Sequence, residues 1–280
     1  MAHSDFLVTA KQLQQKLNDS NIVIIDCHWD ENAYIRAHIP GALKRPGHPY
    51  IKSQEDGIPN KFLPKPDEFL DLLNSMGITN ETEVICYDEW HNHFATRMWW
   101  VMHYYGHKNV KLLDGGWQAW VAEGLPISFQ SENPQVTEEK FRINENQSFN
   151  AQLKEILANY KSEDWQILDV RSDAEFKGEV LSGNKRGGHI PNAIHLEWKR
   201  LLSPSTKYEG VSYFKSEVEM KALFDEAGIK KDKTIAVHCQ AGVRASFSAF
   251  CLEMLGYPNV KLYDGSMGEW ANEKDTPLEK

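Results

Sequence analysis

One segment near the C-terminal end combines residue types that could carry out nucleophilic chemistry. An apolar run over Thr234–His238 leads to Cys239, then to a short loop with Gly242, and then to Arg244 and an apolar stretch with helical periodicity. In a strand–loop–helix unit, the loop amides and the helix N-terminus converge on one point and favour an anion. A helix N-terminus and a nearby arginine also favour the thiolate form of cysteine, which is the nucleophile. We therefore expect Cys239 to be catalytic. The loop residues expected to surround its sulfur are Gln240, Ala241, Gly242, Val243 and Arg244.

The other candidate ligands and thiols lack such a setting. The remaining cysteines are Cys27, Cys86 and Cys251, and no pair has the spacing of a zinc or dithiol motif. We expect these three to be packed in the core, as free cysteines commonly are. His91 and His93 could chelate, but no third ligand follows at a convincing spacing, so we expect neither metal nor cofactor.

The elements that position the cysteine loop follow from hydrophobic patterning. Short apolar runs bounded by turn residues alternate with longer stretches of helical periodicity, which predicts an α/β fold with a mainly parallel sheet flanked by helices. The expected strands cover 22–26, 84–87, 110–113, 167–170, 234–238 and 260–263. The expected helices cover 10–17, 67–76, 95–105, 151–160, 217–227 and 245–255.

The chain repeats itself at an interval of about 150 residues. The run HIPGA at 38–42 returns as HIPNA at 189–193, DGG at 114–116 returns as DGS at 264–266, and Trp120 returns as Trp270. A period this long indicates two copies of one compact domain. We place a first domain at 1–130, a polar linker at 131–147 and a second domain at 148–280. An insertion of about eight residues within 177–186 occurs only in the second copy.

Composition excludes several classes of protein. The chain has 280 residues, 31 Lys and Arg against 40 Asp and Glu, and a formal charge of −9, which argues against nucleic-acid binding. Hydrophobic residues make up 41%, an ordinary share for a globular protein, and no apolar run is long enough to span a membrane. The N-terminus shows no secretory signal pattern. We therefore expect a cytoplasmic protein without membrane contact.

Taken together, the paired HIPGA and HIPNA runs, DGG and DGS with their following tryptophans, and the cysteine loop resemble a tandem-domain sulfurtransferase of the rhodanese family. That family includes thiosulfate and 3-mercaptopyruvate sulfurtransferases, and the resemblance extends from about residue 9 to 270. It implies two tandem rhodanese-like domains, of which the second is catalytic. His38 to Asp88 and His189 to Cys239 both span 50 positions. Asp88 therefore holds the cysteine position of the first domain, which we expect to be catalytically silent.

The resemblance implies a two-step reaction without a cofactor. Cys239 would take the outer sulfur of a small anionic donor such as thiosulfate as a persulfide, and a thiophilic acceptor would remove it. The acceptor would be cyanide, a thiol or a thioredoxin-like protein. Protein-tyrosine phosphatases resemble this loop but have five residues between cysteine and arginine, where this chain has four. Phosphatase or arsenate reductase chemistry is therefore the weaker alternative.

Further substrate-binding residues are implied by the resemblance. Arg171 aligns with a substrate-binding arginine, and Trp29 resembles a first-domain aromatic that lines the cleft facing the catalytic loop. Lys177 and Arg186 lie in the insertion of the second copy and could add a basic rim for an anionic donor. Asp169 is expected to be structural, holding the strand end or Arg244.

The donor and the role remain open at this point. Gln240 and Ala241 are neutral, which is more typical of 3-mercaptopyruvate enzymes, whereas Arg244 slightly favours thiosulfate. A thiosulfate sulfurtransferase is the first choice and a 3-mercaptopyruvate sulfurtransferase the alternative. A persulfide carrier that docks a partner protein is a third hypothesis from another class.

Overall fold

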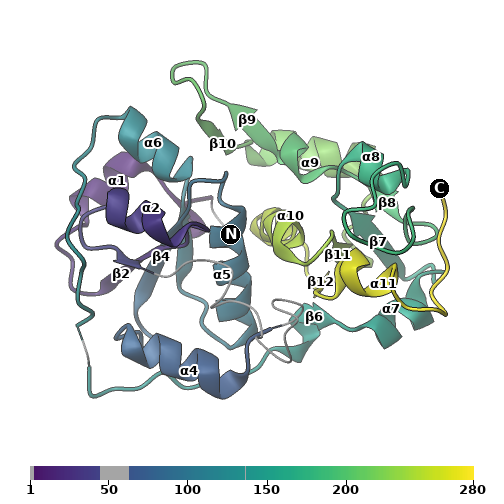
Figure 1. Cartoon of the computed structure of the whole chain (residues 1–280), viewed down its shortest axis with the longest axis horizontal. Helices are drawn as coiled ribbons and strands as arrows, with labels where there is room; N and C mark the ends of the chain where they lie inside the picture. The colour runs from purple at the N-terminus through teal and green to yellow at the C-terminus, as the bar shows by residue number, and fades with distance from the viewer. Residues whose placement is uncertain (1–2, 45–62, 136) are drawn as a thin grey trace. The chain divides into compact units, whose positions relative to one another are not determined.

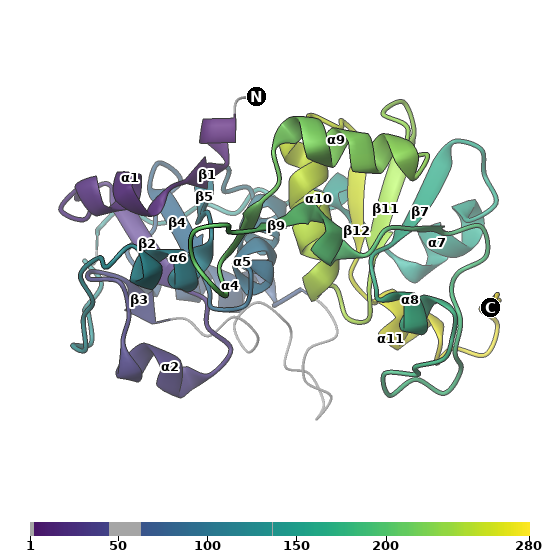
Figure 2. The same ribbon diagram turned by 90° about the horizontal axis from the view of Figure 1, so that it is seen from above.

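The computed structural model describes residues 3–44, 63–135 and 137–280, and these form two compact units. The N-terminal unit runs to Asn146 and also includes the segment Ser203–Phe214. The C-terminal unit consists of Gln147–Leu202 and Lys215–Lys280. Figures 1 and 2 show the elements of both units in two views.

The N-terminal unit is built on a five-stranded parallel sheet in the order β1-β5-β4-β2-β3. The strand β4 therefore lies in the middle of the sheet, between β5 and β2. The strands are β1 Leu7–Val8, β2 Ile22–Asp26, β3 Leu43–Lys44, β4 Glu83–Tyr87 and β5 Val110–Leu113. The helices are α1 Ala10–Gln15, α2 Glu31–Arg36, α4 Pro66–Ser75, α5 His93–Tyr104 and α6 Gly116–Ala122.

The C-terminal unit repeats this plan with the order β6-β12-β11-β7-β8, again all parallel. Its middle strand is β11. The strands are β6 Asn150–Ala151, β7 Trp165–Asp169, β8 Ile194–His195, β11 Thr234–His238 and β12 Val260–Tyr263. The helices are α7 Leu153–Asn159, α8 Asp173–Phe176, α9 Glu217–Glu226, α10 Val243–Met254 and α11 Ser266–Trp270. The predicted α/β class, with two rhodanese-like domains of parallel strands and flanking helices, is confirmed.

Each sheet is covered by helices on both faces, which explains why its strands consist mainly of apolar residues. In the C-terminal unit, α10 lies on one face of the sheet, and α7 and α11 lie on the other (Figure 1). The second face forms a core with Ile167, Ala236 and Tyr263 from the strands and Trp270 from α11. The N-terminal unit has the equivalent core under α1 and α6, with Trp120 at the place of Trp270.

A hairpin of β9 Leu202–Pro204 and β10 Ser212–Phe214 lies within residues 148–280, but from Ser203 onward it belongs by its contacts to the N-terminal unit. The backbone N–H of Phe214 donates to the Asp114 carboxylate at 3.0 Å. Tyr213 packs closely on Gly115, and a Cβ atom added to Gly115 would lie 2.7 Å from the Tyr213 ring. Glycine at position 115 therefore makes room for the hairpin.

The repeated HIP motifs have the same structural role in both units. His38 forms an isolated antiparallel bridge to Ser128, and His189 forms one to Glu279. Each histidine hydrogen bonds through Nδ1 to a nearby carbonyl and stacks on an aromatic ring, Tyr34 for His38 and Phe176 for His189. These histidines build the fold in each unit.

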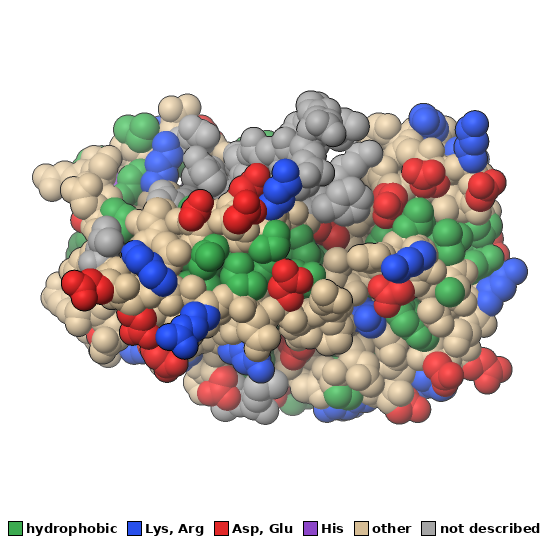
Figure 3. All heavy atoms as spheres, turned by 90° about the horizontal axis from the view of Figure 1, so that it is seen from below, with side chains coloured by type: hydrophobic (Ala, Val, Ile, Leu, Met, Phe, Trp, Pro, Cys, Tyr) green, Lys and Arg blue, Asp and Glu red, His purple; other side chains and the backbone are tan. Residues whose placement is uncertain are grey.

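Charged side chains of both signs are interspersed on the face drawn in Figure 3. The formal charge of −9 is therefore not gathered into one acidic patch on that face.

Candidate active site

The cysteine loop connects the middle strand of the C-terminal sheet to its longest helix. Cys239 directly follows β11, and Gly242 adopts a φ of 78° as the residue before α10. The residue Cys239 is 1% exposed and its thiol is free. Four residues therefore form the whole connection, which makes a tight turn at the helix N-terminus.

The loop is also fixed from α11. The backbone N–H of Met267 donates to the carbonyl of Cys239 at 3.0 Å, and that of Gly268 donates to the carbonyl of Gln240 at 2.8 Å. A Cβ at Gly268 would lie 2.9 Å from the Gln240 carbonyl oxygen, so a glycine permits this approach. The first two residues of the loop are therefore held from a different element.

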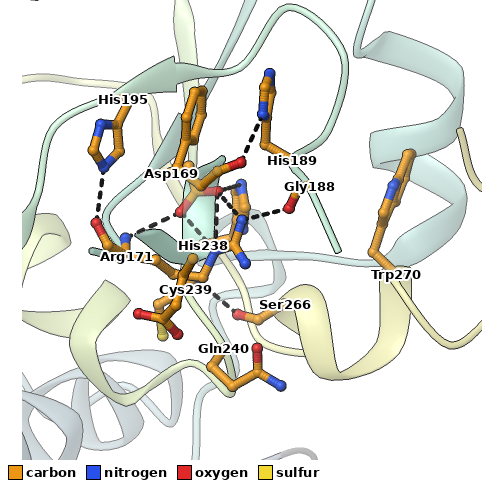
Figure 4. A network of polar contacts seen from close by, with 12 residues as sticks. Asp169, Arg171, Gly188, His189, His195, His238, Cys239, Gln240, Ser266 and Trp270 are labelled. Atoms are coloured by element: carbon orange, nitrogen blue, oxygen red, sulfur yellow. Dashed lines mark hydrogen bonds and ion pairs between the residues drawn. The ribbon is translucent and has the colours of Figure 1, made fainter. Parts of the chain in front are cut away.

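Ser266 lies under the loop and was missed by the sequence analysis as a site residue. Its Oγ accepts a hydrogen bond from the backbone N–H of Cys239 at 3.1 Å (Figure 4). It also accepts one from the backbone N–H of Gly242 at 3.2 Å. It donates to the carbonyl of Tyr263 at 2.8 Å. The sequence did carry a signal for Ser266, because DGG in the first repeat becomes DGS in the second, and the serine is the residue that differs.

Arg244 forms a bidentate ion pair with Glu175 instead of presenting a free cation. Its two terminal nitrogens lie 2.7 and 2.9 Å from the two Glu175 oxygens. Burial raises the pKa of Glu175, but the hydrogen bonds and charge of Arg244 outweigh it and lower that pKa to about 2. Burial acts to lower the pKa of Arg244, and Glu175 and Cys239 together raise it. The positive charge beside the cysteine loop is therefore largely neutralised.

Arg171 is buried and paired, and its expected role in substrate binding stays a prediction. It is 2% exposed, and its guanidinium binds the Asp169 carboxylate with a closest distance of 2.7 Å and the Gly188 carbonyl at 2.8 Å (Figure 4). Of the two roles expected for Asp169, the structure agrees with holding the strand end, and its arginine partner is Arg171 and not Arg244. The two residues lie two positions apart at a strand end, so the carboxylate also accepts the Arg171 backbone N–H.

His238 contacts the same carboxylate from the middle strand. Its Nε2 lies 3.7 Å from Asp169 Oδ2, and within the described part of the chain neither ring nitrogen has a hydrogen-bond partner. Burial, the largest cause, lowers the pKa of His238 to about 4. Burial raises the pKa of Asp169, but His238 and Arg171 lower it below its usual value. At neutral pH the centre therefore holds a neutral histidine beside a paired carboxylate.

The insertion unique to this unit packs on the cysteine loop. The side-chain amides of Gln240 and Asn184 exchange hydrogen bonds of 2.8 and 2.9 Å, and Ser182 donates to Glu175 at 2.9 Å. The insertion therefore supports both Gln240 and the partner of Arg244.

The basic residues of the insertion are engaged within their own unit, and their expected role as a basic rim stays a prediction. Arg186 donates to the carbonyls of Ala271 at 3.2 Å and Thr276 at 2.7 Å, which fastens the C-terminal segment. Lys177 is exposed and pairs with Asp173. Ala241 and Val243 are half-buried in the loop and at the start of α10.

Asp88 takes the corresponding place in the N-terminal unit. It directly follows β4, is fully buried, and leads to α5 through five residues where the cysteine loop has four. Its carboxylate accepts four backbone N–H groups at 2.6 to 2.9 Å, from Trp90, Asn92, Phe94 and Ala95. The loop and helix amides of this fold therefore converge on one anion, as the sequence pattern suggested for Cys239.

The strand-end motif is also repeated with a changed cation. Asp26 accepts the backbone N–H of His28 at 2.9 Å and contacts its imidazole, as Asp169 does with Arg171. Burial lowers the pKa of His28, but Asp26 and the neighbouring acidic residues outweigh it and raise that pKa above its usual value. The shared carboxylate therefore organises the strand end in both units.

Trp29 lies in the N-terminal unit, where its ring stacks on Phe94 at 5.6 Å and the residue is 48% exposed. Its expected role toward the cysteine loop stays a prediction. Among the residues with described placement, no three His, Cys, Asp or Glu side chains form a group that could hold a metal.

The chain matches known proteins along its length. The family model of the rhodanese-like domain matches twice, over residues 9–123 and 152–273. The sulfur carrier protein TtuD of Thermus thermophilus is 34% identical over 289 residues, covering 100% of this chain and 98% of that protein. A Mycobacterium tuberculosis protein named "Putative thiosulfate sulfurtransferase" is 35% identical over 289 residues, covering 100% of this chain and 99% of that protein.

Solved structures with the same fold include an enzyme with a sulfur-loaded cysteine. EanB with a cysteine persulfide and ergothioneine superimposes with a TM-score of 0.87 at 25% identity, over 99% of this chain and 70% of that one. The anaerobic ergothioneine biosynthesis enzyme of Chlorobium limicola with trimethyl histidine gives 0.85 at 26% identity, with the same coverage. None of the helices in the described ranges has the length and apolarity to cross a membrane.

Proposed function

The chain belongs to the rhodanese family, and on this premise we propose that it is a sulfurtransferase that moves a sulfane sulfur from thiosulfate to a thiophilic acceptor through a persulfide on Cys239. The observation that carries the proposal is the correspondence between Cys239 and Asp88. Four backbone N–H groups bind the anionic side chain in one unit, and a nucleophilic sulfur holds the equivalent place in the other.

The reaction proceeds in two balanced steps. The Cys239 thiolate attacks the outer sulfur of thiosulfate, a new sulfur–sulfur bond forms, and sulfite leaves with the electron pair of the broken bond. The acceptor, for example cyanide, then attacks the outer sulfur of the persulfide, and the Cys239 thiolate leaves to restore the free enzyme. With cyanide the product is thiocyanate.

Backbone amides are the main stabilising groups in this proposal. The persulfide keeps a negative charge, which the convergent N–H groups and the N-terminus of α10 favour. Arg244 contributes less than a free cation because Glu175 neutralises it. This pairing removes the slight preference for thiosulfate that Arg244 suggested, so 3-mercaptopyruvate stays the alternative donor.

The N-terminal unit has no sulfur at the equivalent place, and we infer that it does not transfer sulfur. The Asp88 carboxylate already uses the four amides there. An anionic donor would meet a like charge and no nucleophile.

A persulfide carrier is a second candidate, favoured by the 34% identity to the sulfur carrier protein TtuD. The first half of the reaction is the same in a carrier. The difference lies in the acceptor, which would be the thiol of another protein instead of a small molecule.

Intact mass spectrometry tests the proposal directly. The protein is incubated with thiosulfate or with 3-mercaptopyruvate, and one added sulfur atom is expected on the wild type and on Cys251→Ser, but not on Cys239→Ser. Cys251 is a matched control because it is buried in the helix that follows the same loop. The donor that loads faster is the preferred one.

Discharge then separates the remaining roles. Rapid thiocyanate formation with ping-pong kinetics supports the enzyme, whereas slow discharge to cyanide and fast discharge to a protein thiol support the carrier. Absence of a persulfide together with hydrolysis of p-nitrophenyl phosphate would reject both in favour of a phosphatase.

A further inference from the structure

We propose that Ser266 is a positioning residue for Cys239, holding the first and last residues of the cysteine loop so that the other loop amides stay directed at the sulfur. The inference rests on the proposed function of the same site and adds a residue from α11 to it. Ser266 is fully buried and is not itself placed in contact with a substrate.

The hydroxyl group uses all of its hydrogen-bonding capacity on this loop and its support. It accepts the N–H groups of Cys239 at 3.1 Å and Gly242 at 3.2 Å, and it donates to the Tyr263 carbonyl at 2.8 Å. Tyr263 ends β12, the strand beside β11, so the hydroxyl connects the loop to the rigid sheet. One small side chain therefore fixes both ends of a four-residue turn.

The backbone conformation of Ser266 favours glycine, which indicates that the serine hydroxyl contributes to the site. Its φ is 51°, in the left-handed region where a side chain is unfavourable and glycine is not. The N-terminal unit has Gly116 at this place with a φ of 58°. A glycine would meet the same backbone requirement without strain, so what serine adds is the hydroxyl.

The N-terminal unit shows what the hydroxyl replaces. There the last residue before the helix, Asn92, donates its N–H to the Asp88 carboxylate at 2.9 Å. The equivalent N–H in the cysteine loop, that of Gly242, donates to Ser266. A carboxylate with two oxygens can organise its own loop, whereas a single sulfur cannot, and the Ser266 hydroxyl supplies the missing acceptor.

Three substitutions separate the hydroxyl from backbone strain. Ser266→Gly removes both, Ser266→Ala removes the hydroxyl and keeps the strain, and Ser266→Thr keeps the hydroxyl with added strain. We expect Gly and Ala to lower kcat for sulfur transfer by about tenfold with little change in KM, because each lost hydrogen bond corresponds to a several-fold factor. Thr should recover most of kcat. The melting temperature should be higher for Gly than for Ala, because both lack the hydroxyl and only Gly relieves the strain.

A second readout does not depend on sulfur transfer. The rate of Cys239 alkylation by iodoacetamide is followed by peptide mass spectrometry across pH. The variants are compared by the pH at which this rate is half its maximum. The maximal rate itself is not compared, because it also depends on how often the loop opens. We expect this pH to rise in Gly and Ala but not in Thr. Ser248→Ala is the matched control, because Ser248 is buried in α10 and its hydroxyl has no partner among the described residues.

The outcomes distinguish the two proposals. A Gly variant with wild-type kcat and an unchanged alkylation profile would overturn the role of Ser266. A loss of kcat that is larger in Ala than in Gly, in step with their melting temperatures, would also overturn it, since both lack the hydroxyl and the difference would indicate a structural role alone. If the wild type forms no persulfide with either donor, the proposed function fails, and the alkylation profiles still decide whether Ser266 positions Cys239.

Discussion

Cys239 and Asp88 hold equivalent places in the two units of this protein. Each directly follows the middle strand of a five-stranded parallel sheet, and each begins the loop to a helix of 12 residues. The carboxylate of Asp88 accepts four backbone N–H groups, which demonstrates where the amides of this fold converge. The same fold thus presents an anion in one unit and a thiol in the other.

Removing the Asp88 carboxylate should destabilise the N-terminal unit. Asp88→Ala leaves four buried N–H groups without their acceptor, and we expect the free energy of unfolding to fall by about 3 kcal/mol or more, since unpaired buried groups cost about 1–3 kcal/mol each. Asp88→Asn, which keeps one oxygen, should lose less. Hydrogen exchange of the α5 amides during denaturation measures this loss, with exposed Asp164→Asn as the control. Equal stability of both Asp88 variants and the control would contradict the assignment.

Replacing Arg171 should mainly lower the free energy of unfolding, and not substrate affinity. Arg171→Ala leaves Asp169 as a buried charge without its arginine, which typically costs about 3–5 kcal/mol. Lys177→Ala removes an exposed pair and should cost no more than about 1 kcal/mol. Chemical denaturation of both variants tests this difference. A stable Arg171→Ala protein with only a raised KM would instead support the original expectation of a substrate ligand.

The Glu175–Arg244 pair should make the free energy of unfolding depend on pH in the acid range. The pKa of Glu175 is about 2 in the folded protein against 4.5 for a free glutamate, so its stabilisation is full above pH 4.5 and is lost as the pH falls toward 2. Glu175→Gln should be less stable at pH 7 and should lack this component of the acid dependence. Denaturant midpoints recorded from pH 7 to 2 provide the measurement. Parallel curves for the variant and the wild type would speak against a paired Glu175.

His238 should add a second acid-dependent component to stability, at a higher pH than that of Glu175. Burial lowers its pKa to about 4 from 6.5, so the unfolded chain takes up a proton first, and stability falls as the pH drops from 6.5 to 4. His238→Gln should flatten that interval. The imidazole proton resonances of His238 should show no titration until the pH approaches 4. A midpoint near 6.5 would exclude the neutral, buried state described here.

Much of the fold was predictable because it depends on local patterns. The apolar runs at 22–26, 110–113, 234–238 and 260–263 became strands with those bounds, since doubly covered parallel strands consist almost entirely of apolar residues. The helix expected at 245–255 begins two residues earlier, at Val243, because Gly242 with its positive φ ends the loop there. Helix ends depend on such single turns and are less evident in the sequence.

The partners of the charged residues were not predictable. The sequence placed Arg171 and Arg244 near the cysteine, but it left Asp169 between the strand end and Arg244 and assigned Arg171 to a donor. The structure pairs Arg171 with Asp169 two positions away, and Arg244 with Glu175, which is 69 positions away. Long flexible side chains can reach several carboxylates, and only the packed surroundings select one.

The sequence by itself determined the duplication, the parallel α/β architecture of each copy and the loop that carries Cys239, because these follow from repeats, short-range periodicity and a four-residue spacing. The tertiary structure decided which groups surround that cysteine. Ser266 is 27 positions from Cys239 and reaches it because β12 lies beside β11, a neighbourhood set by strand order. Hydrogen bonds between distant segments form only once the sheet has brought those segments together.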